Sequence, residues 1–339
     1  YTVGIARYSD FDENDYEDHQ AHLSAGMKTP RGFYLTVQNR FQDTEDPFGS
    51  ESEFRIGTQT ERWNNRARLV AGAEFAETYG IEGTYHNFVE RYDLIKDEFQ
   101  DQTHHEYGVA VLYRVTGKTS LFGQFLRTDV EYDSQNDGID EDNDGFNEWN
   151  SSNSQDYTVN GFFIGARFDP RSKLSGEFKI GYGTIDFEND VDVNGNKFND
   201  NDFWLMVANV GFQFREKTGL SLTVDTSKQP STTADIASDV SATFRQISAK
   251  LDLTQNFTER MSANFGLGYR YRDYLDEASG IPDKYFNLYT AKFRAGYLIQ
   301  DWLEVGLEYT YDNNQASDSL YELDEYTVNT VAVMVKATF

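Results

Sequence analysis

The residues from 325 to 339 alternate in polarity, and this ending constrains the fold more than any other feature of the chain. The odd-numbered positions are apolar: Val331, Val333, Val335, Ala337 and Phe339. The even-numbered positions are mostly polar: Thr330, Ala332, Met334, Lys336 and Thr338. Because alternate side chains of a β-strand point to opposite faces, the segment predicts a strand with one apolar face. Its length suits a tilted strand crossing a bilayer, which takes about 9–11 residues. The edge strand of a soluble sandwich would alternate as well, so the fold depends on whether the pattern repeats.

The alternation recurs along the chain. Segments 261–272, 107–115 and 303–310 each place large apolar residues on one parity. The other parity of 261–272 and 303–310 holds mainly glycine and charged residues, and that of 107–115 holds Gly108, Ala110, Leu112 and Arg114. We predict sixteen strands, at approximately 2–9, 21–28, 33–41, 51–76, 81–95, 102–115, 119–134, 155–169, 174–188, 202–215, 220–227, 240–255, 260–275, 285–299, 302–311 and 325–339. An even count is what single-chain bacterial barrels have.

Two kinds of connection separate these segments. The short ones are 29–32, 77–80, 116–118, 170–173, 216–219, 256–259 and 300–301. The long, acidic ones are 10–20, 42–50, 96–101, 135–154, 189–201, 228–239, 276–284 and 312–324. Tight turns at one end and long loops at the other are typical of outer-membrane barrels, and with both termini on the short-turn side we expect that side to be periplasmic. We expect the long fourth segment to project beyond the membrane, unless Asn64-Asn65 forms a turn within it.

The residues on the polar face of each strand distinguish a barrel from a sandwich. A sandwich carries bulky residues on both inner faces, whereas here the face opposite the apolar one holds glycine and charge, which suits a wet lumen. Aromatic residues at strand ends suit the interfacial girdles of a membrane barrel. The sequence therefore predicts an all-β fold: a transmembrane antiparallel up-and-down β-barrel of about 16 strands, with short periplasmic turns and long acidic extracellular loops. No linker or break in composition divides the chain, so we predict a single domain, residues 1–339.

Composition narrows the functional classes. The chain has 57 acidic and 30 basic residues, and its net charge of −27 argues against a nucleic-acid partner, because phosphate binding requires a basic surface. No run of 18 apolar residues exists, which excludes a transmembrane helix. The first residue is Tyr1 rather than Met, from which we expect a processed mature chain. The absence of cysteine fits export.

The same parity rule predicts which charged residues line the lumen. The basic ones are Arg40, Arg68, Arg114, Arg167, Arg215, Lys250, Arg270, Arg272, Lys292, Arg294 and Lys336. The acidic ones are Glu74, Glu177, Asp225, Asp252, Glu304 and Glu308. Basic residues outnumber acidic residues on this predicted wall, so the excess acidic residues of the chain must lie mainly in the outer loops. A basic wall would favour anionic solutes. If the same residues instead pair across strands, they only keep the wall hydrated, and each pair stabilises the sheet by about 0.2–1 kcal/mol.

Two of the long loops resemble calcium-binding sequences. In the first, Asp140, Asp142 and Asp144 followed by Gly145 match the start of a calcium loop, with Glu148 at the ninth position. The twelfth position is Ser151, so the usual bidentate Glu is missing. The second loop offers Asp192, Asn194, Asn196 and Asp200 in the same alternation. We predict Ca²⁺ as a ligand of these loops; the alternative is a solvated acidic surface that meets lipopolysaccharide phosphates only through bridging divalent ions.

Signals for catalysis are missing. The five histidines are His19, His22, His86, His104 and His105, and none accompanies a serine and an acid in a recognisable nucleophile arrangement. No phosphate loop or dinucleotide fingerprint is present. We therefore expect that the protein is not an enzyme and that the histidines line the rim of the barrel.

Several stretches resemble a family of outer-membrane β-barrel porins. They include Trp63–Gly72, Asn87–Asp93, Tyr113–Phe122 and Phe168–Tyr182, continuing to Phe187. The terminal Phe339 is similar to the signal by which outer-membrane barrels are recognised for insertion. Genes of this family often lie beside genes for exopolysaccharide synthesis and export. The resemblance covers most of the chain and carries no catalytic motif.

The resemblance implies a bacterial outer-membrane barrel through which a secreted polysaccharide crosses. Its expected partners are that polysaccharide, a periplasmic polysaccharide export protein, and outer-membrane lipid with lipopolysaccharide. Two other functions stay open: a general diffusion porin for small anionic solutes, and a barrel whose calcium-binding outer loops serve adhesion or partner binding.

Overall fold

The structure is a computed structural model that describes residues 1–6, 16–44, 61–93, 101–132, 156–189, 202–230, 243–275, 284–318 and 325–337. These residues form strands and short turns. The strands are β1 (Thr2–Ala6), β2 (Tyr16–Lys28), β3 (Phe33–Thr44), β4 (Arg62–Phe75), β5 (Tyr79–Tyr92), β6 (Gln102–Thr116), β7 (Thr119–Tyr132), β8 (Tyr157–Phe168), β9 (Leu174–Phe187), β10 (Phe203–Arg215), β11 (Thr218–Pro230), β12 (Thr243–Asn256), β13 (Met261–Leu275), β14 (Tyr285–Gln300), β15 (Leu303–Ala316) and β16 (Tyr326–Ala337). The described residues include no helix long and apolar enough to cross a membrane.

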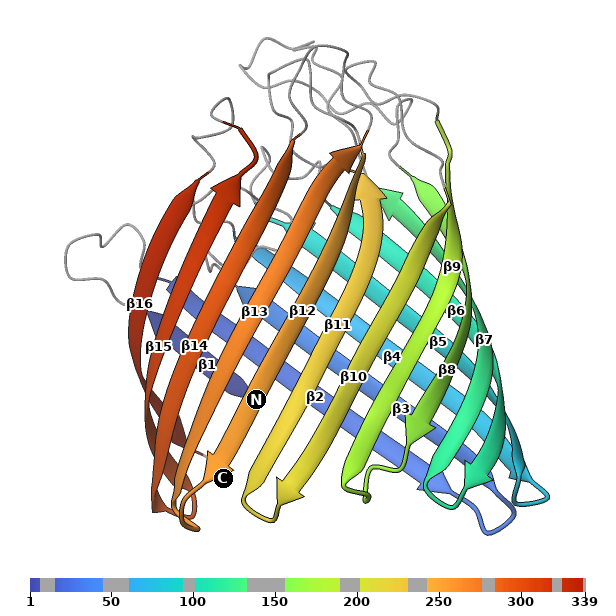
Figure 1. Cartoon of the computed structure of the whole chain (residues 1–339), viewed down its shortest axis with the longest axis horizontal. Coiled ribbons are helices and arrows are strands. Elements are labelled where there is room, and N and C mark those ends of the chain that lie inside the picture. Colours follow the sequence, from blue (N-terminus) through green and yellow to red (C-terminus); the bar gives the residue numbers. More distant parts are fainter. Residues whose placement is uncertain are drawn as a thin grey trace.

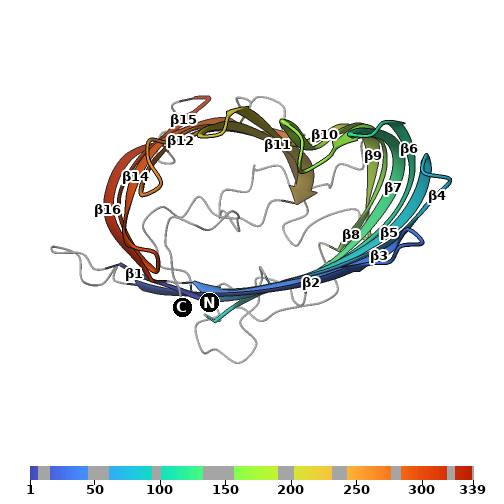
Figure 2. The same ribbon diagram turned by 90° about the horizontal axis from the view of Figure 1, so that it is seen from below.

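All the strands belong to one sheet in chain order. The sheet has 16 strands, and each pairs antiparallel with the next strand along the chain, from β1 to β16 (Figure 1). Viewed along its axis, the sheet bends round into a flattened ring that brings β1 and β16 to the same side (Figure 2). The predicted up-and-down β-barrel is therefore the fold of this chain.

The two ends of the barrel differ in their connections. The described turns at one end are short, such as 117–118 between β6 and β7 and 216–217 between β10 and β11. The connections at the other end are long and carry most of the surplus acidic residues of the sequence. Because successive strands run in opposite directions, every long connection joins strand ends on the same side. The predicted asymmetry is thus present, with short turns facing the periplasm.

Large apolar side chains cover the outer face. Along β16, Val331, Val333 and Val335 are 69%, 73% and 68% exposed, and along β8 Phe162 and Ile164 are exposed as well. Such a surface would be unstable in water but suits contact with hydrocarbon. The alternation of side chains across a strand therefore gives the barrel its lipid-facing surface.

Some predicted strand boundaries need correction. Residues 51–60 of the predicted fourth strand lie outside the described residues. The described strand begins at Arg62, and Asn64 and Asn65 lie within it, opposite Gln42 and Phe41 of β3. The alternative of a turn at these asparagines is therefore wrong, because cross-strand pairing overrides their local turn preference. The strand β1 covers only the outer part of β2, with Thr2 opposite Gln20, so Tyr1 lies part-way along the wall rather than at the short-turn end.

The lumen face also holds a hydrophobic cluster that the parity analysis missed. Its buried members, on β7–β10, are Val130, Tyr132, Tyr157, Phe163, Ile185, Phe203 and Leu205. Phe163 shares the parity of Arg167 on β8, opposite to the exposed Ile164. Gly181 faces this cluster, and a Cβ there would meet the Phe163 ring. Inward glycines in this part of the wall therefore make room for large apolar side chains, and the inner face is not simply glycine plus charge.

Candidate functional site

One cross-barrel contact identifies the lumen face. Arg167 on β8 donates from both terminal guanidinium nitrogens to Glu82 on β5, at 3.0 Å each. Two strands, β6 and β7, lie between β5 and β8 in the sheet. Side chains of such distant strands converge only on the concave side of a curved sheet, because they diverge on the convex side. The parity of Arg167 and Glu82 therefore faces inward.

These two residues form the centre of a buried polar network. Arg167 also donates from Nε to Glu177 on β9 at 2.8 Å, and the Tyr34 hydroxyl on β3 donates to Glu82 at 2.6 Å. The Glu82 side chain is only 5% exposed. A buried carboxylate of this kind is tolerated because it accepts several charge-assisted hydrogen bonds. The network joins β3, β5, β8 and β9 on the lumen side of the sheet.

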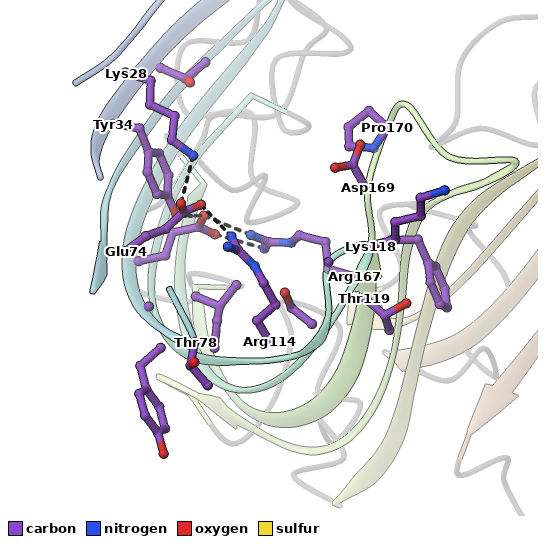
Figure 3. Close-up of a pocket in the computed structure, with 18 of the residues that line it drawn as sticks. Lys28, Tyr34, Glu74, Thr78, Arg114, Lys118, Thr119, Arg167, Asp169 and Pro170 are labelled. Atoms are coloured by element: carbon purple, nitrogen blue, oxygen red, sulfur yellow. Dashed lines mark hydrogen bonds and ion pairs between the residues drawn. The ribbon is translucent and has the colours of Figure 1, made fainter. Parts of the chain in front are cut away.

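A second, more exposed network lies beside the first, toward the short turns. Lys28 Nζ lies 2.9 Å from Glu74, and an Arg114 guanidinium nitrogen lies 3.3 Å from the same carboxylate. Arg114 also donates to the backbone carbonyl of Glu77 at 3.2 Å. Figure 3 shows Lys28 and Arg114 converging on Glu74 from two sides. A cavity of about 560 Å³ opens here at the periplasmic mouth of the lumen.

The opposite arc of the wall carries further ion pairs. They are Lys250 with Asp252 at 3.1 Å, Lys292 with Glu308 at 2.6 Å and Arg294 with Glu304 at 3.3 Å. Each pair lies within one strand or between neighbouring strands β14 and β15. Paired charges keep the wall hydrated while cancelling much of its field, so the wall as described is polar without being a ring of one sign.

The remaining basic residues predicted for the lumen have varied surroundings. Arg272 donates to Gln246 and its guanidinium group stacks over the Phe244 ring at 4.3 Å. Arg40 contacts Gln42. Among the described residues, Arg68, Arg270 and Lys336 have no ion pair. Arg215 follows a register irregularity at the end of β10.

Parity also accounts for lumen residues that were not singled out in the sequence. Glu82, Lys28 and Tyr34 belong to the two networks, and Lys179 lies 4.6 Å above the Phe163 ring. Their alternation signal was the same as that of the predicted residues. What the sequence could not show is which distant strands come into contact, since that depends on the curvature of the ring.

Two of the histidines contact neighbouring polar side chains. His86 pairs with Glu106 at 3.0 Å and His104 contacts Gln102 at 2.8 Å, both toward the long-connection end. Within the described ranges, no group of three or more His, Cys, Asp or Glu side chains is placed to hold a metal ion. The predicted calcium ligands, from Asp140 to Glu148 and from Asp192 to Asp200, lie outside the described residues.

Comparison of the sequence with known protein families agrees with the β-barrel fold. The family described as "Putative beta-barrel porin 2" matches residues 1–339. The chain belongs to this family. Membership gives the protein its general character, a porin-type β-barrel of the outer membrane. No curated protein sequence matches the chain.

The solved structures similar to this chain are of longer chains. FpvA of P. aeruginosa bound to heterologous pyoverdines is 9% identical with a TM-score of 0.47, over 96% of this chain and 53% of that one. The FrpB iron transporter from Neisseria meningitidis is 10% identical with a TM-score of 0.47, over 89% and 53%. The alcaligin receptor FauA from Bordetella pertussis is 12% identical with a TM-score of 0.45, over 96% and 57%. This chain thus spans little more than half of their length, and similarity at this level says nothing of what it transports.

Proposed function

We propose that this barrel is a passive conduit through which a secreted polysaccharide crosses the outer membrane. Synthesis and the periplasmic export apparatus would supply the driving force, and the barrel would supply a continuous hydrated path. A periplasmic polysaccharide export protein would dock against the short-turn end. The resemblance of the strand segments to porins encoded beside export genes supports this cargo.

The observation that carries the proposal is the composition of the lumen wall. Its carboxylates and cations are largely paired, as in the Lys28–Glu74–Arg114 group and the Lys292–Glu308 pair. A wall of this kind offers many donors and acceptors to hydroxyl groups but holds no strong net field along its described part. Such a surface suits a hydrophilic polymer that must slide past many sites without binding tightly to any one.

A deletion experiment tests the conduit. Removing the gene from a strain that secretes polysaccharide should stop the polymer from reaching the cell surface, and it should accumulate in the periplasm. A plasmid copy of the wild-type barrel should restore export. Normal amounts of surface polymer in the deletion strain would contradict the proposal, provided that no second barrel of the family is encoded.

The second candidate is a general diffusion porin for small anionic solutes. It is favoured by the described lumen cations that have no ion pair, Arg68, Arg270 and Lys336. Reversal potentials of the purified barrel in a planar bilayer discriminate between the two. The conduit predicts weak ion selectivity because most wall charges are compensated, whereas a pore that is always open and strongly selective for anions would favour the diffusion porin.

We also propose, from the sequence of the outer loops, that these bind Ca²⁺ and thereby contact lipopolysaccharide or an external partner. Calorimetry with calcium should show binding at or below millimolar metal, and the Asp142→Ala variant should weaken it. An Asp18→Ala variant serves as a control, because this carboxylate contacts the Thr44 hydroxyl within the strands. No heat on adding millimolar calcium would rule out the loop sites.

A further inference from the structure

The cavity at the periplasmic mouth is an open-sided corner of the lumen. The strands β2–β6 form one wall, with Lys28, Tyr34, Glu74 and Arg114, and the β6–β7 and β8–β9 turns form the other. Figure 3 shows Lys118, Asp169 and Pro170 on this second wall, across the cavity from Lys28 and Glu74. Its volume of about 560 Å³ is that of a small-molecule site, for which about 300–1,000 Å³ is typical.

Four cations and three carboxylates line the cavity, and Glu177, outside the lining, supplies a fourth carboxylate beside Arg167. Two cations face Glu74, and two carboxylates, Glu82 and Glu177, face Arg167. The second wall adds one residue of each sign, Lys118 and Asp169. An anionic ligand would therefore find no surplus of positive charge. A hydroxyl group, by contrast, both donates and accepts, so it can bridge a carboxylate oxygen and a neighbouring ammonium or guanidinium group.

Spare hydrogen-bonding capacity is concentrated at Lys28 and Arg114. Their side chains are 57% and 38% exposed, and each uses only part of its N–H groups in the contacts with Glu74 and Glu77. Arg167, in contrast, is engaged by both Glu82 and Glu177. The exposed network is therefore the part of the cavity that offers donors to a ligand.

Tyr34 gives the cavity an aromatic surface. A Cβ at Gly72 would meet the Tyr34 ring, so the absence of a side chain there lets the ring lie against β4. The hydroxyl is fixed by its hydrogen bond to Glu82, and Lys28 Nζ lies 6.0 Å from the ring centroid. A ring held in this way is a preorganised platform for the C–H face of a pyranose, with polar groups at its edge.

We propose that this cavity is a binding subsite for a neutral sugar residue, placed where an exported chain enters the barrel. The inference rests on the proposed function, because it assigns the cavity to the same cargo. Sugar hydroxyls bind between Glu74 and its two cations while one sugar face covers Tyr34. The subsite guides the chain end into the lumen and selects against polymers whose every residue is charged.

Single-channel recording of the full barrel tests the subsite. The probes are maltohexaose, cellohexaose and isomaltohexaose at millimolar concentration on the short-turn side, with hexagalacturonate as the anionic comparison. At least one neutral probe should block the current in resolvable events, more frequently than hexagalacturonate. Lys28→Ala and Arg114→Ala should each shorten the blocks about tenfold, equivalent to about 1.4 kcal/mol. Lys292→Ala, on the far arc of the lumen, should shorten them much less.

The outward-facing Arg127, paired with Asp129, provides the matched control. Arg127→Ala removes an ion-paired arginine that is 51% exposed, against 38% for Arg114, and should leave block durations unchanged. The subsite is overturned if no neutral probe blocks, if hexagalacturonate blocks longer, or if Lys292→Ala acts as strongly as Arg114→Ala. Deletion of the gene reports separately on the conduit: blocks by neutral sugars together with undisturbed export would retain the subsite and reject the conduit.

Discussion

At the scale of single residues, the stability of the wall from β3 to β9 depends on whether its buried charge is compensated. Glu82 is nearly inaccessible and relies on Arg167 and Tyr34 for its hydrogen bonds. Removing one partner of a buried pair leaves the other charge unpaired, which is far more costly than losing an exposed pair.

We therefore expect Arg167→Met to lower the free energy of unfolding by about 3 kcal/mol or more. Arg114→Ala, which breaks only exposed contacts, should cost about 1 kcal/mol or less. Adding Glu82→Gln to Arg167→Met should recover part of the loss, because the unpaired carboxylate is gone. Urea unfolding in lipid vesicles measures all three, and equal losses for Arg167→Met and Arg114→Ala would contradict this account.

Gly72 provides a second residue-scale test. A methyl group there must displace the Tyr34 ring and so weaken its hydrogen bond to Glu82. Overpacking of this kind costs about 1–3 kcal/mol. Gly72→Ala should thus reduce unfolding stability by that amount. A Cβ added at Gly123 would meet nothing within 4 Å, so Gly123→Ala is the control. If the two variants were equally stable, the Tyr34 ring would not be held as described.

At the scale of the strand, the alternation of lipid-facing and lumen-facing residues was readable from the sequence. Along β16, Val331 faces outward and the adjacent Thr330 faces inward, as the polarity pattern predicted. The pattern worked because hydrocarbon and water make opposite demands on neighbouring side chains. It was less informative in β7–β10, where Phe163 and Ile164 are both apolar and only the packing distinguishes their faces.

This alternation can be measured on neighbouring residues. Val331→Arg should destabilise the barrel by about 2–4 kcal/mol, the cost of arginine near the bilayer midplane. Thr330→Arg should change stability by about 0.5 kcal/mol or less, because its side chain reaches the hydrated lumen. Unfolding in vesicles gives both values. Similar penalties at the two positions would show that β16 does not have one wet and one lipid face.

The hydrophobic cluster of β7–β10 makes a complementary prediction. Ile185 is 0% exposed on the lumen side, whereas Ile164 is 70% exposed on the outer face. Ile185→Ala should leave a cavity and cost about 2–5 kcal/mol. Ile164→Ala should cost less, since lipid chains fill the space that the side chain leaves. A smaller loss at Ile185 than at Ile164 would mean that the cluster is not a packed core inside the barrel.

At the scale of the whole molecule, strand number and the difference between the two ends followed from the sequence, whereas the shape of the lumen did not. The Arg167–Glu82 contact spans two intervening strands, and such a contact depends on how sharply the ring bends (Figure 2). Likewise, the sequence left open whether the charged lumen residues form a basic wall or pair across strands. Lys292 and Glu308 are paired. Sequence periodicity specifies the face of a side chain but not its partner across the lumen.

The most direct measurement of the central claim uses the absence of cysteine from the chain. Single cysteines at Lys292 and Phe293 occupy neighbouring positions of β14, one on the lumen face and one on the lipid face. Cells that secrete polysaccharide are treated with a bulky, membrane-impermeant maleimide. We predict that Lys292→Cys reacts and that surface polymer falls, while Phe293→Cys stays unmodified and exports normally. Equal reactivity at both positions, or undiminished export after full modification of Lys292→Cys, would contradict the account.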